Sequence, residues 1–402
     1  MKKLLLMAVA SLMILSSCEK EPIEPNVDTV LVGTLTENKT LTSDKVWTLK
    51  GYVYVPEGIT LTIEPGTVIK SDISEKGALT IERGGKIMAE GTEDKPIVFT
   101  SGQSSPQSGD WGGVVILGRA RTNQGEPTIE GGIGRVYGGS DDSDNSGVLK
   151  YVRIEYAGIA AFANSEVNAL TLGGVGSGTK IEFVECYYSF DDAFEFFGGT
   201  VSPKYLVAVG TGDDDYDFDF GYTGTIQYAI SKRDPLFVDG ADAGNGIECD
   251  NDGTGSSLTP TTHPTLLNFT LVGPNSPNSL ANHNLAMRWR RGTNFTVRNS
   301  IFYGYMKGCF SIESDITATY FRDNHGNFTN NTLHSVDTTK IVVSKATGVI
   351  TTDDMITKVK HSGNTIYTSS DSPIFNTFET KTGNVGAIPQ GTTNWLIGWT
   401  KL

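Results

Sequence analysis

The chain has 402 residues, a formal net charge of −14 and 38% hydrophobic residues, which is enough apolar surface for a sizeable buried core. The acidic balance argues against nucleic acid as a partner, because phosphate backbones are bound by surfaces rich in Lys and Arg. Beyond the N-terminal segment, no apolar run in the sequence is long enough to cross a membrane as a helix.

The first 17 residues predict a lipoprotein signal peptide. Lys2 and Lys3 precede an apolar run, which ends in small residues before Cys18. The ending LSSC matches the bacterial lipobox, in which the Cys thiol is acylated and becomes the first residue of the mature protein. We therefore expect Cys18 to carry lipid. The charged, Pro-containing stretch EKEPIEPNVD follows Cys18, and residues 18–40 are predicted to form an acidic tether.

An acidic tether directly after the lipidated Cys resembles the surface-export signal of Bacteroidota lipoproteins. The resemblance implies a protein anchored in the outer membrane through its lipid alone and facing the cell exterior. The other cysteines, Cys186, Cys249 and Cys309, are odd in number and lie in apolar alternations. We expect them to be buried free thiols.

Residues 41–402 are predicted to form one domain built from short repeats. The stretch LTIEPGTVIK at 61–70 is echoed by LTIERGGKIM at 79–88, and later segments repeat an Asn-Phe-Thr strand start. Each segment alternates apolar and polar residues and ends in Gly, Asn or Asp, which is typical of short strands closed by turns. Repeats of roughly 18 to 30 residues made of such strands indicate a solenoid. The spacing favours an all-β, right-handed parallel β-helix.

The repeat fades in residues 335–402, which are predicted to form a C-terminal cap or a laterally packed segment. Trp395 and Trp399 lie near the end of this segment. Because an open solenoid end would expose its core, we expect these two side chains to seal it.

Three stretches carry a resemblance to a known family: GALTIERGGKIMAEGTEDKPIVFTS, GVGSGTKIEFVECYYSFDDAFEFFGGTV and DDDYDFDFGYTGTIQYAI. Over roughly residues 50–290 the sequence resembles an uncharacterised family of Bacteroidota surface lipoproteins with a pectin-lyase-like fold. The resemblance implies the β-helix and a surface location. It implies no activity.

The acidic repeat in the middle of the chain predicts a row of charges on one outer face. If Phe194 and Phe218 point into the core, the residues beside them point outward. Neighbouring coils lie about 4.8 Å apart, so outward acids on successive coils repel one another. Repulsion would be offset by arginines at one end, by bound Ca²⁺ or by protonation. The predicted ladder consists of Glu195, Asp219, Glu248 and Arg288.

Clustered Asp residues make Ca²⁺ a candidate cofactor, because this ion takes six to eight oxygen ligands. One stretch, DSDNSG at 142–147, copies the first half of an EF-hand loop, although Arg153 stands where the loop ends in Glu. The alternative is that these residues cap the turns of the solenoid through their own backbone. The candidate ligands are Asp142, Asp144, Asp191, Asp192, Asp213, Asp214, Asp215, Asp217, Asp250 and Asp252.

An enzymatic interpretation starts from the same ladder. The stretches FDDAFEFF and RWR resemble two of the catalytic motifs of polygalacturonases, but the order differs and the G-H-G motif is missing. Glu195 and Glu248, two coils apart, would be separated by about 9.6 Å, close to the spacing of inverting glycosidases. A lyase would instead use Ca²⁺ on the acids and Arg288 as the base.

The sequence therefore leaves three functions open. The favoured one is a monomeric, lipid-anchored surface protein that binds glycan or another extracellular ligand along its elongated face without catalysis. The second is a polysaccharide hydrolase or lyase, and the third is a structural adhesin.

Overall fold

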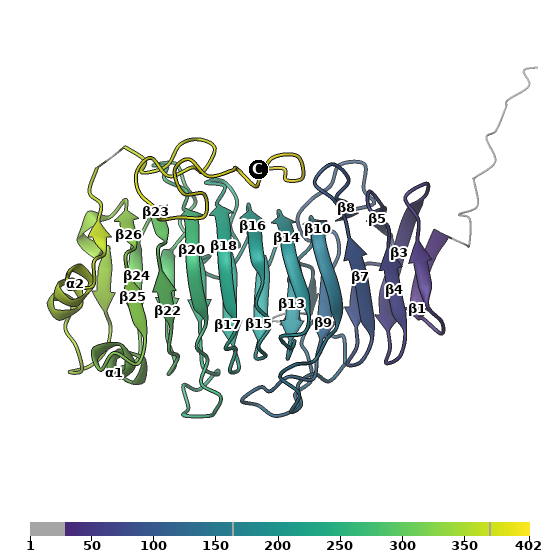
Figure 1. Ribbon diagram of the computed structural model, residues 1–402, viewed down its shortest axis with the longest axis horizontal. Coiled ribbons are helices and arrows are strands. Elements are labelled where there is room, and N and C mark those ends of the chain that lie inside the picture. The colour runs from purple at the N-terminus through teal and green to yellow at the C-terminus, as the bar shows by residue number, and fades with distance from the viewer. Residues whose placement is uncertain (1–28, 163–164, 370) are drawn as a thin grey trace, which may run out of the picture.

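The computed structural model describes residues 29–162, 165–369 and 371–402 and shows an elongated solenoid of parallel strands (Figure 1). The prediction of an all-β parallel β-helix is confirmed: 26 strands join in one continuous parallel sheet that winds around a single core. The strands fall into three columns, which we call the first, second and third faces.

The first two faces share several long strands that bend at the corner between them. The first face comprises β2 (Lys39–Leu41), β4 (Thr60–Ile63), β7 (Lys86–Glu90), β22 (Thr296–Arg298), β25 (Asn327–Thr329) and the N-terminal parts of the shared strands. The shared strands are β10 (Gly147–Glu155), β14 (Lys180–Tyr187), β16 (Lys204–Val209), β18 (Thr225–Lys232) and β20 (Thr265–Val272). The second face adds β5 (Val68–Ser71), β8 (Ile97–Thr100), β23 (Ile301–Tyr305), β26 (Thr332–Ser335) and β28 (Thr365–Ile366).

The third face carries the acidic stretches. It contains β6 (Ala78–Ile81), β9 (Gly113–Leu117), β13 (Leu170–Gly173), β15 (Phe194–Phe197), β17 (Tyr216–Asp219), β19 (Ile247–Cys249), β21 (Leu285–Trp289), β24 (Gly308–Ile312) and β27 (Val342–Ser344). A small hairpin of β11 (Ala160–Phe162) and β12 (Ser165–Glu166) projects between β10 and β13.

Alternation along the strands builds the core. On the third face, Phe194 stacks on Tyr216 at 5.3 Å and Phe196 stacks on Phe218 at 5.1 Å between ring centroids. All four side chains are buried, so the inward assignment of Phe194 and Phe218 is confirmed. The three free cysteines are buried as predicted, and each lies in the core.

The solenoid begins earlier than expected. β1 (Val30–Thr34) pairs with β3 (Val46–Val55), and β2 pairs with β4, so residues 30–41 already belong to the β-helix. The prediction of a tether as far as residue 40 is therefore wrong for this part, because Leu31 and Leu41 are buried in the core. Cys18 and the signal peptide lie outside the described residues.

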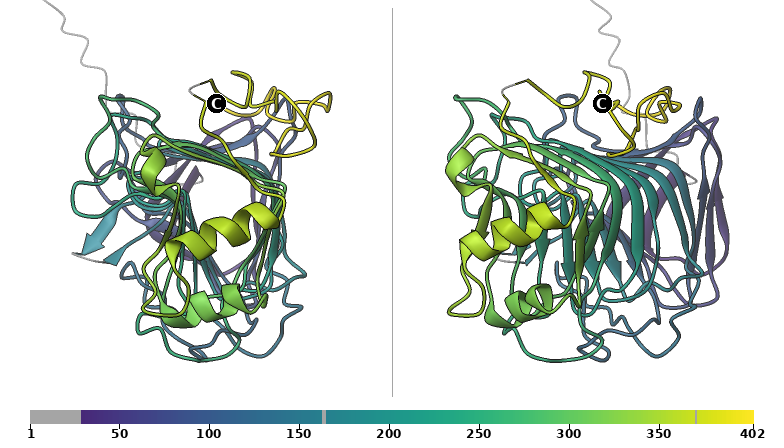
Figure 2. Two further views of the ribbon diagram at one scale, coloured as in Figure 1. Left: turned by 90° about the vertical axis from the view of Figure 1, so that its left-hand side faces the viewer. Right: turned by 60° about the vertical axis from the view of Figure 1, so that its left-hand side comes forward.

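A helix, not the two tryptophans, closes the C-terminal end of the solenoid. α1 (Asp315–Arg322) lies at the side of the last coils, and α2 (Thr352–His361) lies across the end (Figure 2). Met355 and Val359 of α2 are buried against the core. The prediction that Trp395 and Trp399 seal this end is wrong.

The last segment of the chain runs back along the outside of the second face (Figure 1). We call residues 371–402 the strap. Ile388, Leu396 and Trp399 of the strap pack on outward apolar residues of the sheet such as Val207 and Ile230. These outward side chains need cover from water, which explains why the strap lies along the side. Among the residues that the structure describes, no helix has the length and apolar character required to cross a membrane.

Candidate functional site

The predicted charge ladder lies on the outer side of the third face, but one of its four members is wrong. Glu195 of β15 pairs in register with Asp217 of β17, and Glu248 of β19 continues the row. Arg288 of β21 follows Glu248. Asp219 lies two residues further along β17 and pairs with the last residue of β15. Both Asp residues face outward, so alternation did not distinguish them, and the hydrogen bonds between coils select Asp217.

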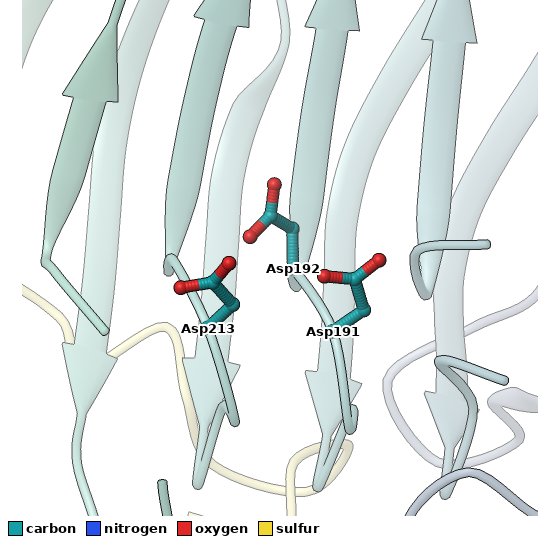
Figure 3. Close-up of side chains that lie close together, drawn as sticks. All are labelled: Asp191, Asp192 and Asp213. Atoms are coloured by element: carbon teal, nitrogen blue, oxygen red, sulfur yellow. The ribbon is translucent and has the colours of Figure 1, made fainter. Parts of the chain in front are cut away.

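Carboxylates from two consecutive coils meet beside this ladder (Figure 3). Asp191 and Asp192 precede β15, and Asp213 precedes β17. Carboxylate oxygens of these three residues lie within 4.8 Å of one another, and the same holds for Asp192, Glu195 and Asp217. Asp192 belongs to both groups. We call the five residues Asp191, Asp192, Glu195, Asp213 and Asp217 the acidic cluster.

Among the described residues, the acidic cluster has no ion-pair partner. The pKa of each of the five carboxyl groups is raised. Burial is the larger cause, and repulsion from neighbouring carboxylates is the next. Glu195 is only 7% exposed although it faces away from the core. Within the described ranges, no Lys, Arg or His side chain forms an ion pair with any of the five.

The next coils of the same face are different, because arginines neutralise their acids. Arg288 contacts Glu248 at 2.8 Å and Glu313 at 3.3 Å, and it is 21% exposed. Arg290 forms ion pairs with Glu248 and with Asp250, the latter at 2.7 Å. Burial and nearby acids still raise the pKa of Glu248 to about 8 despite both arginines. We call these residues the paired end of the ladder.

A long connection, residues 118–146, covers the third face on the N-terminal side of the acidic cluster. Its Ile129, Ile133 and Tyr137 pack against outward apolar residues of β9 and β15. The same connection brings Glu130 within hydrogen-bonding reach of Glu195, and burial raises the pKa of Glu130. Sequence reasoning missed Glu130, because it lies far from Glu195 in the chain and nothing in its local pattern marks it.

Some of the predicted metal ligands accept hydrogen bonds from the next coil. Asp192 accepts a hydrogen bond from the Asp214 backbone N–H at 2.7 Å, and Asp214 accepts one from the Asn245 N–H at 2.5 Å. Burial raises the pKa of Asp214 to about 8. Asn168 occupies the matching position one coil earlier, and its amide contacts Glu195. An Asn or Asp stands two residues before each of β13, β15, β17 and β19, and this repeated signal could have identified Asn168.

The other predicted ligands lie apart from the acidic cluster. Asp215 faces the core, where it pairs with the buried Arg233 at 3.3 Å. Asp142 pairs with Arg121, and Asp144 accepts a hydrogen bond from Ser146. Asp250 belongs to the paired end. Asp252 accepts hydrogen bonds from Ser256 and Thr254, which lower its pKa to about 2 although burial raises it. Asp252 therefore caps its own turn.

A family model described as a pectate-lyase-like β-helix domain matches residues 33–400. The chain belongs to this family. No curated protein matches the chain, and neither does any solved structure. Membership of the β-helix family accounts for the fold over nearly the whole described length, but the fold by itself specifies no activity.

The chemistry of the acidic cluster suits a hard divalent cation. Its donors are carboxylate oxygens alone, and the two oxygen groups that share Asp192 contain no His or Cys. Oxygen-only sites favour Ca²⁺ or Mg²⁺ over zinc or copper, and the flexible coordination of Ca²⁺ tolerates an irregular set of ligands. The residues that would hold such an ion are therefore Asp191, Asp192, Glu195, Asp213 and Asp217.

Proposed function

We propose that this protein binds an acidic glycan at the cell surface through Ca²⁺ held by the acidic cluster, without catalysis. The observation that supports it is the group of five converging carboxylates with no ion-pair partner in the described part of the chain. An acidic glycan would be repelled by this face on its own. A bound cation offsets that repulsion and offers coordination sites to the carboxylates of the glycan.

The length of the third face also favours a polymer as the ligand. Outward residues recur on successive coils about 4.8 Å apart, so one chain of sugars can contact several coils. This part of the proposal rests on the repeat geometry of the fold.

The geometry of Arg288 favours binding over lyase chemistry. A lyase base must give up its own proton before it can take one from the sugar. Glu248 and Glu313 hold Arg288 in two ion pairs, and these acids raise its pKa although burial lowers it. Arg288 therefore stays charged and serves as the counter-ion of the paired end.

The decisive experiment measures Ca²⁺ and glycan binding together. Added Ca²⁺ should raise the melting temperature of the protein, by an amount equivalent to about 2.7 kcal/mol at a hundredfold excess over its dissociation constant. Immobilised polygalacturonate should retain the protein in Ca²⁺ and release it in a chelator. Asp192→Asn should abolish both effects, because Asp192 belongs to both oxygen groups. Its Asn oxygen can still accept the Asp214 hydrogen bond.

Asp252→Asn is the matched control, because Asp252 uses its carboxylate within its own turn. This variant should bind Ca²⁺ and polygalacturonate like the wild type. Equal melting temperatures of the wild type in chelator and in millimolar Ca²⁺ would overturn the proposal.

A polysaccharide hydrolase is the second candidate function. It is favoured by Glu248, because burial and nearby acids raise its pKa to about 8, towards the range that suits a general acid. Product analysis on acidic polysaccharides separates the two functions. A hydrolase should release reducing ends, and Glu248→Gln should lower that rate at least about a hundredfold. A binding protein should release no product in either form.

We also propose that the protein is a monomeric Bacteroidota lipoprotein anchored in the outer membrane through Cys18 and facing the cell exterior. The lipobox and the acidic residues after it support this location. Metabolic labelling with a palmitate analogue should mark the wild type and leave Cys18→Ala unlabelled. Protease treatment of intact cells should remove the domain, and its survival would contradict the outward orientation.

A further inference from the structure

A cavity of about 250 Å³ lies between the corner of the first two faces and the strap. The corner contributes Phe183, Tyr205 and Tyr228, and the strap contributes Trp395 together with Thr392 and Thr393. The cavity is far from the acidic cluster in the fold, because these residues belong to the shared strands and the strap and not to the third face.

The residue that turns this corner differs from coil to coil. Seven successive coils turn this corner through one residue with positive φ, between 48° and 63°. Asn adopts this conformation most readily among residues with a side chain, and bulky residues adopt it reluctantly. The last three coils place Asn there, whereas the first four place an aromatic residue. The positions are Tyr151, Phe183, Tyr205, Tyr228, Asn268, Asn299 and Asn330.

The four aromatic rings stack face to face along the solenoid. Their centroids are separated by 4.4 Å between Tyr151 and Phe183, and by 4.3 Å between Phe183 and Tyr205. Tyr228 extends the stack at 5.1 Å from Tyr205. The positive φ at these positions disfavours aromatic residues, so the contacts of the rings must explain why aromatic residues stand there.

Packing of the strap accounts for the first three rings and not for the fourth. Trp399 contacts Tyr151 and Phe183, and Trp395 contacts Phe183 and Tyr205. Within the described residues, the only aromatic ring that contacts Tyr228 is that of Tyr205. Tyr228 instead forms a wall of the cavity, and its hydroxyl has no hydrogen-bond partner in the described part of the chain.

We propose that this cavity binds a single neutral pyranose ring. Its walls combine aromatic rings, which pack against the apolar C–H faces of a sugar, with Thr and Tyr hydroxyls, which hydrogen-bond to sugar hydroxyls. Among the residues that the structure describes, no Asp, Glu, Lys, Arg or His lines the cavity, so no described side chain there compensates the charge of a uronic acid. A volume of about 250 Å³ equals roughly eight waters at about 30 Å³ each, which suits one ring and not two.

This inference goes beyond the proposed function, since it concerns a second site, of different chemistry, on another part of the surface. The two sites together would let the protein hold an acidic chain on the third face and a neutral sugar, such as a branch or chain end, at the corner.

Tryptophan fluorescence tests the site directly, because Trp395 lines it. The probes are the methyl pyranosides of glucose, galactose and mannose, each titrated into the full-length folded domain. At least one should give a saturable change in fluorescence. Tyr228→Ala should weaken that binding by at least about tenfold, in the range expected for loss of an aromatic stacking partner. Thr393→Val, which keeps the shape and removes one hydroxyl, should weaken it less.

Tyr151→Ala is the matched control, because Tyr151 ends the same stack on the opposite side and does not line the cavity. It should bind the sugar like the wild type, and so should Asp192→Asn and the wild type in chelator, which separates this site from the acidic cluster. Absence of saturable binding for all three pyranosides would overturn the proposal. So would equal binding of a methyl uronide, or an equal loss of binding in Tyr151→Ala and Tyr228→Ala.

Discussion

The acidic cluster and the paired end occupy neighbouring coils of one face, yet their acids are stabilised in different ways. At the paired end, Arg288 on β21 and Arg290 directly after it lie beside the acids, so the chain supplies its own counter-charge. In the acidic cluster, five carboxylates converge without an ion-pair partner among the described residues. The comparison indicates two roles for a row of outward acids. Where arginines form ion pairs with the acids, the row is a structural element. Where no arginine does so, the row is a candidate ligand site.

The largest expected effect comes from the core that both regions share. Phe218 is buried beneath the ladder and stacks on Phe196 and Tyr222. Phe218→Ala should lower the free energy of unfolding by about 3–5 kcal/mol, because it leaves a cavity under both regions. Denaturant titration measures the change. Phe190→Ala, at an exposed position, should stay within about 0.5 kcal/mol of the wild type.

Removal of an arginine should break the paired end without affecting the cluster. Arg288→Ala leaves Glu248 and Glu313 without a major partner, and it should cost about 2–3 kcal/mol, somewhat less than for a fully buried pair. Arg322→Ala, which removes an exposed pair with Asp323, should change the stability far less, because solvent screens that pair. Equal stability of Arg288→Ala and the wild type would show that the paired end needs no counter-charge.

The two regions should also give the protein an unusual dependence on pH in the absence of Ca²⁺. Raised pKa values in the folded state mean that folding favours the protonated carboxyls. Stability should therefore be greatest near pH 4 and fall as the pH rises towards 8, the pKa of Asp214 and Glu248. We expect a loss of at least about 1.4 kcal/mol, equivalent to one pKa unit. Thermal melts in chelator across this range measure it, and saturating Ca²⁺ should flatten the curve.

The smallest effect is expected from neutralising one member of the acidic cluster. Glu195→Gln removes a charge that its neighbours repel, and its amide oxygen can still accept the hydrogen bond from Asn168. Stability in chelator should stay within about 1 kcal/mol of the wild type, on the higher side. The same substitution should weaken Ca²⁺ binding. A marked loss of stability in chelator would mean that the Asn168 amide stabilises the charge of Glu195 more than the neighbouring acids oppose it.

The sequence by itself determined the fold class and the side on which most residues of the third face lie. Because strand residues alternate, Phe194 had to point inward once Glu195 pointed outward, and the same holds for Phe218 beside Asp217 and Asp219. It also determined that acids would gather on successive coils and that Arg288 would follow them. Alternation alone would also turn Phe220 inward, but Phe220 has a φ of 50° just after β17, and its ring contacts Phe197 outside the main core.

Only the tertiary structure decided the register between coils and the contacts between distant segments. A shift of two residues leaves alternation unchanged, so the pattern fits Asp217 and Asp219 equally well, and hydrogen bonds to β15 and β19 select Asp217. The position of Glu130 beside Glu195 and the path of the strap depend on long connections whose direction no local pattern specifies. Asp caps turns as readily as it binds cations, so composition alone did not separate Asp252 from Asp192; their surroundings in the folded chain did.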